Sequence, residues 1–233
     1  EPFTYEYADG WSNLWEYAYT INYMLFLLLA ISLANVFSVE YYRKTDAIIL
    51  CSKYGKKQLY FSKILAGITF SVVSAVLLFI ATLLSSVFVY GTNGFHAALQ
   101  LIFPFSSWNI SVGGSILILF FSLIAISVLY GCVIMLLSAI LKSNVAVMAV
   151  PVGIMILTMM VDVPYQFRLA SQVYDLLPTN LLNTTELWDD RLICILGRYF
   201  TNFQIAPFLY LVFAVLLILV GMVIYQRHQV QAR

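Results

Sequence analysis

The sequence predicts an all-α integral membrane protein, a polytopic helix bundle that crosses the bilayer several times. Of its 233 residues, 62% are hydrophobic and only 10% are charged, whereas a soluble domain averages about 45–50% apolar and about 25% charged residues. The apolar residues gather into five long stretches that contain no Asp, Glu, Lys, Arg or His. This composition excludes a soluble globular enzyme, and a net charge of +1 offers no basic surface for a nucleic acid.

The five stretches are the expected transmembrane helices, because a helix needs about 20 mostly apolar residues to cross a bilayer. They are too long and too uniformly apolar for the strands of a membrane barrel, which alternate over about 10 residues. Only Lys142, Ser143 and Asn144 separate the third stretch from the fourth, which predicts a tight helical hairpin. Pro151 is expected to kink the fourth helix, since it removes a backbone donor. The stretches are 21–37, 64–90, 115–141, 145–161 and 204–225.

The charged residues between the stretches predict an orientation. When five helices are threaded alternately, nine of the 12 Lys and Arg residues fall on one side, together with only two of the 11 Asp and Glu residues. Cytoplasmic loops carry the excess of Lys and Arg, so we expect residue 1 outside and the C-terminus in the cytoplasm. An odd number of helices that starts outside indicates a further helix before residue 1, and hence six helices in the full-length protein.

The residue patterns of membrane enzymes and ion-coupled carriers are absent. His96 and His228 do not form a His-Glu-x-x-His motif, no carboxylate lies within a stretch, and no Gly-x-x-x-x-Gly-Lys-Ser/Thr loop occurs. An ion-coupled carrier usually places an ionisable residue near the membrane midplane. We therefore expect no catalytic residue, metal or cofactor in this chain, and an energy source on another polypeptide if it moves a solute.

Small residues line one side of the second stretch, where Gly67, Ser71, Ser74 and Ala75 cluster. Such residues let helices approach closely in lipid. Three interpretations stay open from the sequence: packing within the chain, a seam between two copies, or a hydroxyl-lined path for an amphiphilic substrate.

Two outer segments are expected at the membrane surface. Residues 1–19 are acidic and aromatic, and Trp11 and Trp15 are typical of the aromatic belt at a membrane interface. The extracytoplasmic segment 164–203 alternates polar and apolar residues, which predicts short helices that lie on or dip into the outer leaflet.

The predicted cytoplasmic segment 38–63 carries the most specific signal. Apolar residues at 47–50 stand beside charged ones, which predicts a short helix over 40–51 with one apolar side. Gly55 is a natural stop for this helix, because glycine readily adopts the left-handed conformation that closes a helix. A basic patch that binds anionic lipid headgroups is the competing interpretation.

This segment resembles the first cytoplasmic loop of ABC-2-type permeases, the membrane subunits of ATP-binding-cassette exporters. That family carries a Glu, a Thr five residues later, an apolar pair, a Ser or Thr before Pro, a basic residue, and a Lys entering the next helix. The chain departs from the pattern at Lys44, where the family often has Gly, and at Lys53, where it has Pro. The matching residues are Glu40, Thr45, Ile49, Leu50, Ser52, Lys56 and Lys63.

The resemblance implies that residues 1–233 form a single permease domain that lacks its first helix. Such permeases pair as dimers in the bacterial cytoplasmic membrane and dock separate ATPase subunits, which bind the ATP and Mg. A cytoplasmic coupling helix then transmits ATPase closure to the spans, and substrate is exported. A non-transporting membrane anchor or immunity-type protein is the alternative. The resemblance assigns coupling to Glu40, Thr45, Asp46, Ile49, Ser52, Lys53, Lys56 and Lys63.

Overall fold

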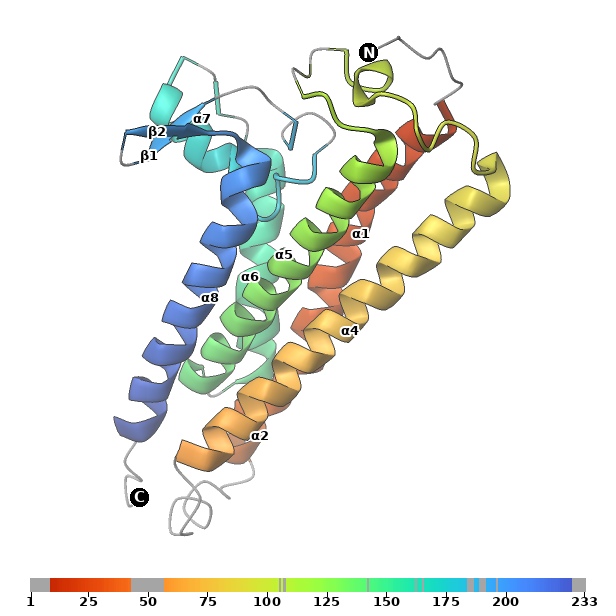
Figure 1. The fold of residues 1–233 in the computed structure, drawn as a ribbon. Helices are drawn as coiled ribbons and strands as arrows, with labels where there is room; N and C mark the ends of the chain where they lie inside the picture. Colours follow the sequence, from red (N-terminus) through yellow and green to blue (C-terminus); the bar gives the residue numbers. More distant parts are fainter. Residues whose placement is uncertain are drawn as a thin grey trace.

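The computed structural model shows a bundle of long helices with a small cap at one end (Figure 1). The cap holds loops, the short helix α7 (Arg168–Asp175), the 3-10 helix η1 (Leu99–Leu101) and one strand pair. It describes residues 9–42, 57–104, 106, 108–141, 143–161, 163–164, 166–183, 187–188, 192–195 and 197–227. The bundle helices are α1 (Asp9–Leu33), α2 (Asn35–Tyr42), α4 (Lys57–Tyr90), α5 (Val112–Ile140), α6 (Asn144–Met160) and α8 (Asn202–Arg227).

The long helices alternate in direction, as the sequence predicted. The end of α2, the start of α4, the α5–α6 turn and the end of α8 lie together at one end of the bundle (Figure 1), which we call the α2 end. The opposite end, the α7 end, carries the short helix α7 (Arg168–Asp175) and the antiparallel strands β1 (Ile193–Ile195) and β2 (Arg198–Phe200).

Among the described residues, four helices are long and apolar enough to cross a bilayer, rather than the five expected. These are Gly10–Glu40, which runs through α1 and α2, then Lys57–Tyr90, Val112–Ile140 and Asn202–Gln226. The expected span 145–161 is helix α6, which has 17 residues. At 1.5 Å per residue it is about 26 Å long, short of a hydrocarbon core of about 30 Å. Five spans are therefore not confirmed.

The first span begins much earlier than expected. The helix starts at Asp9 rather than near residue 21, and Trp11 and Trp15 are buried in the core instead of forming an interfacial belt. The Trp11 indole Nε1 donates to the Asn93 carbonyl at 2.8 Å. Trp15 stacks edge-on against Phe103, with ring centroids 5.8 Å apart. The aromatic N-terminal residues thus anchor the loop that joins α4 to α5.

Helix α5 is the central element. About 61% of its most apolar stretch is buried, compared with 22% for α4 and for α8. The small residues of α4 explain the close α4–α5 contact, because Gly67, Ser71, Ser74 and Ala75 are all buried. A side chain at Gly67 would overlap Met135, and one at Gly131 would overlap Ser71. The small-residue stripe is therefore used for packing within the chain.

The segment 164–203 holds a short helix, as expected, but also a β-hairpin that was not. Gly197 turns the hairpin with a φ of +79°, in the left-handed region that glycine tolerates best. In α7 the polar Ser171 and Asp175 are buried, while Leu169 and Val173 are exposed. Its apolar side thus faces away from the bundle, which is the arrangement expected of a helix beside lipid.

Candidate functional site

The clearest polar site lies at the α2 end and joins the two helices that flank residues 43–56. Lys63 on α4 forms an ion pair with Glu40 on α2, and its Nζ also donates to the Val36 carbonyl at 2.7 Å. The side chains are 20% and 13% exposed, respectively. Lys63 Nζ also lies 4.8 Å from the centroid of the Phe37 ring. The ammonium group is therefore held by a carboxylate, a carbonyl and an aromatic face.

Helix α8 joins the same site through Tyr225. Its hydroxyl donates to Glu40 Oε2 at 3.5 Å, a long hydrogen bond. The rings of Phe37, Tyr60 and Tyr225 pack with centroids 5.5–5.7 Å apart. We call Phe37, Glu40, Tyr60, Lys63 and Tyr225 the basal cluster. It fastens α2, α4 and α8 to one another.

Tyr60 makes the contact between α4 and α8 specific. Its hydroxyl donates to the Ile218 carbonyl at 2.8 Å. One turn along α8, Gly221 leaves room for this hydroxyl, since a Cβ there would lie 2.5 Å from it. Without a side chain at Gly221, the tyrosine reaches the backbone of α8 directly.

A second buried polar site holds the joint between α1 and α2. The Ser138 hydroxyl on α5 accepts hydrogen bonds from the amides of Phe37 and Ser38, both at 3.1 Å, and donates to the Ala34 carbonyl at 2.7 Å. Ser38 also donates to Ala34, at 2.6 Å, and contacts the Asn144 side chain at the start of α6. The first amides of a helix lack partners within the helix, and here a serine of another helix caps them.

The basal cluster and the Ser138 joint both connect helices through polar contacts. Their polar groups are engaged in ion pairs and hydrogen bonds within the bundle. Within the part of the chain that the structure describes, no group of three or more His, Cys, Asp or Glu residues is arranged to hold a metal ion. Both sites link helices at the α2 end of the bundle, so a displacement of one helix there is passed to its neighbours.

The structure brings together two of the residues assigned from the sequence, Glu40 and Lys63. Residues 40–42 of the helix expected over 40–51 belong to α2, and residues 43–51 lie outside the described residues. Helix α4 begins at Lys57, so Lys63 lies in its second turn. Sequence reasoning missed Phe37, Tyr60, Tyr225 and Ser138, and no local pattern pointed to them. The remaining assigned residues lie outside the described residues: Thr45, Asp46, Ile49, Ser52, Lys53 and Lys56.

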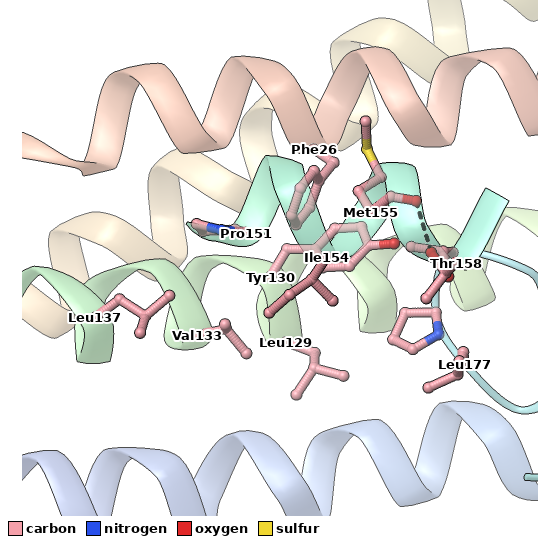
Figure 2. Close-up of a pocket in the computed structure, with 12 residues that line it drawn as sticks. Phe26, Leu129, Tyr130, Val133, Leu137, Pro151, Ile154, Met155, Thr158 and Leu177 are labelled. Atoms are coloured by element: carbon pink, nitrogen blue, oxygen red, sulfur yellow. Dashed lines mark hydrogen bonds between the residues drawn. The ribbon is translucent and has the colours of Figure 1, made fainter. Parts of the chain in front are cut away.

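A cavity of about 150 Å³ lies between α5 and α6 (Figure 2). Leu129, Val133 and Leu137 form a row along α5, and Pro151 and Met155 face them from α6. The rest of the lining is Phe26 of α1, Tyr130 of α5, Ile154 and Thr158 of α6, and the segment 177–179. Its walls are almost entirely apolar, which is typical of a site for a hydrophobic ligand.

Comparison of the chain with protein-family models, with curated proteins and with solved structures found no match. The fold itself is that of an all-α bundle with several apolar helices of membrane-spanning length, and it is compatible with a multi-pass membrane protein. Any more particular function therefore depends on the residues of the sites described above.

Proposed function

We propose that the chain is the permease subunit of an ABC exporter, with the α2 end in the cytoplasm and residue 1 outside. The observation that carries the proposal is the segment 38–63. Seven of its residues resemble the coupling loop of ABC-2-type permeases in type and spacing, with departures at Lys44 and Lys53. In addition, its two ends meet in the ion pair between Glu40 and Lys63.

The charge distribution along the alternating bundle supports the orientation. Six Lys and Arg residues belong to segment 38–63, and two of them, Lys57 and Lys63, are described at the α2 end. The α7 end carries Asp175 and Glu16 together with Arg168 and Arg198, so it has no excess of basic residues among those described. An excess of basic residues marks the cytoplasmic side, which in the proposed bacterial host is the side on which an ATPase would bind.

The basal cluster suggests how the proposed coupling works. An ATPase that moves residues 43–56 pulls on the end of α2 and on the start of α4. Because Glu40 and Lys63 are paired, the two helices move as a unit when residues 43–56 are displaced. Tyr60 and Tyr225 extend this unit to α8. Glu40 and Lys63 are thus positioning residues, and the partner-facing role is left to Ile49 and its neighbours.

The proposal is tested by affinity purification of the full-length protein in mild detergent, followed by identification of what co-purifies. We expect a cytoplasmic ATPase with a P-loop and a second permease subunit. Ile49→Asp, which places a charge on the apolar side of the expected coupling helix, should abolish ATPase recovery. Lys57→Ala, on an exposed position at the start of α4, is the matched control and should leave recovery unchanged.

A second experiment separates coupling from docking. Lys63→Met should leave the ATPase bound but change the ATP hydrolysis rate of the reconstituted complex, because the linkage between α2 and α4 is lost. If no ATPase is recovered with the wild-type protein, the membrane anchor or immunity-type alternative takes the place of the exporter.

A further inference from the structure

We propose that α7 completes the membrane crossing that α6 begins, with the outer side of α7 in contact with the acyl chains of the leaflet at the α7 end. Leu169 and Val173 form this outer side, and Phe167 directly precedes it. The inference requires that the bundle lies in a bilayer. It does not depend on the exporter proposal.

The two sides of α7 are reversed relative to a helix on the surface of a soluble domain. Such a helix buries its apolar residues and turns its polar residues to the solvent. In α7 the polar Ser171 and Asp175 are 1% and 5% exposed, whereas Leu169 and Val173, one turn apart, are 80% and 64% exposed. Apolar surface is transferred favourably from water to an apolar medium, so hydrocarbon is the medium that suits this outer side.

Helix α6 is shorter than the membrane core, and α7 is placed to supply the missing length. With 17 residues α6 is about 26 Å long, about 4 Å less than a hydrocarbon core of about 30 Å. A helix that lies in the interface buries its apolar side by about 5–10 Å. Met160 and Val161 at the end of α6 are exposed, as is Phe167 before α7. The exposed apolar surface of α6 therefore continues along the chain onto α7.

Tyr174 fixes α7 against the end of α6. Its hydroxyl donates to the carbonyls of Thr158 and Val161, which share its hydrogen. The last carbonyls of a helix lack partners within the helix, and in hydrocarbon no water is present to satisfy them. A side chain of α7 thus performs at the end of α6 the role that water performs for a helix ending in solvent, as expected if α6 ends inside the membrane.

The charge at the start of α7 is compatible with this depth. Arg168 is the first residue of the helix and is exposed. A long arginine side chain keeps its stem along apolar surface while the guanidinium reaches the polar region. The guanidinium can therefore lie among the headgroups while Leu169 and Val173 lie below them.

The test measures which medium surrounds α7 in the purified full chain, reconstituted in nanodiscs. Single cysteines are introduced at Leu169 and Val173 in a background without the three native cysteines, and each is labelled with the fluorophore NBD. Phosphatidylcholine with brominated acyl chains quenches a fluorophore among the chains, and iodide quenches one in water. Cysteines at Leu216, exposed on α8, and at His96, exposed in the loop before α5, are the two references. We expect lipid quenching at 169 and 173 close to that at 216 and several-fold above that at 96.

Two variants test the tie between α7 and α6. Tyr174→Phe removes the hydroxyl and should lower the lipid quenching at position 169 but not at 216. Tyr199→Phe changes an exposed tyrosine of the hairpin and is the matched control, which should leave both values unchanged. An unchanged value at 169 in Tyr174→Phe would overturn the role assigned to this tyrosine.

Two outcomes would overturn the proposal itself. Quenching at position 169 by iodide and not by brominated lipid would show that α7 lies in water. Protection from both quenchers would show that a protein, such as a second copy of the chain, covers this side of α7. Either result would leave the exporter proposal untouched, because no ATPase takes part in the measurement.

Discussion

The ion pair between Glu40 and Lys63 gives the most direct test of the basal cluster. Lys63→Met keeps most of the aliphatic stem but removes the ammonium group. The substitution removes the ion-pair partner of the Glu40 carboxylate, whose side chain is 13% exposed, and it removes the donor to the Val36 carbonyl. We therefore expect a lower free energy of unfolding.

The magnitude follows from the exposure of the pair. An exposed pair contributes about 0–1 kcal/mol, while breaking a well-buried pair costs about 3–5 kcal/mol. With side chains 20% and 13% exposed, this pair falls between those limits, and we expect a coupling energy of about 1–2 kcal/mol. Loss of the hydrogen bond to Val36 adds about 1 kcal/mol, so Lys63→Met should destabilise the protein by about 2–3 kcal/mol in total.

The assay is a double-mutant cycle with Glu40→Gln and Lys63→Met, in which the free energy of unfolding is measured by denaturant titration in mixed micelles. Lys57→Met removes a charge from an exposed position of the same helix and should change stability by less than about 0.5 kcal/mol. Independent sites add to within about 0.3–0.5 kcal/mol. A coupling energy inside that band would refute the claim that the pair joins α2 to α4.

Three further predictions concern the joint, the helix packing and the orientation. Ser138→Ala should destabilise the protein by about 1–3 kcal/mol, because two buried amides lose their acceptor, and unfolding in micelles measures this. Gly131→Val should lower the thermal midpoint in detergent through overpacking of about 1–3 kcal/mol, whereas Gly153→Ala, with open space around it, should not. Single cysteines at Lys56 and Glu186 in a cysteine-free background should show labelling by an impermeant maleimide in intact cells only at position 186, and labelling at position 56 would reverse the proposed orientation.

Hydropathy was sufficient to predict the helical class and the position of the long helices. Each span is continuous in sequence, so its apolar length can be counted directly. Helices α5 and α8 lie within three residues of the predicted stretches at both ends, and α4 ends at the predicted Tyr90 but begins seven residues earlier, at Lys57. The start of α1 was missed because Trp11 and Trp15 suit an interface as well as a core. What decides between the two is a hydrogen bond from Trp11 to Asn93, 82 residues away, and no local pattern reports such a contact.

Of the candidate site, only the residues that lie within one short segment of the sequence were predicted. Glu40 and Lys63 were singled out because they belong to one short segment. Tyr225 is 185 residues from Glu40, and Ser138 is about one hundred residues from the amides that it caps. A serine or tyrosine in an apolar helix can bond to many different groups, so its residue type does not specify its partner. The partner is set by how the helices pack in the bundle. The β-hairpin was missed because its two strands have three residues each, too few to show an alternating pattern.

The Ser138 joint has a consequence for how the bundle can change shape. A bend caused by proline is a property of one helix, and it persists whatever the neighbouring helices do. The break at Ala34 is instead completed by a hydroxyl from α5. If α5 slides along α1, the amides of Phe37 and Ser38 lose or regain their acceptor together. The direction in which α2 leaves α1 is therefore tied to the axial position of α5. A shift of α5 along its axis and a change in the angle between α1 and α2 should occur together.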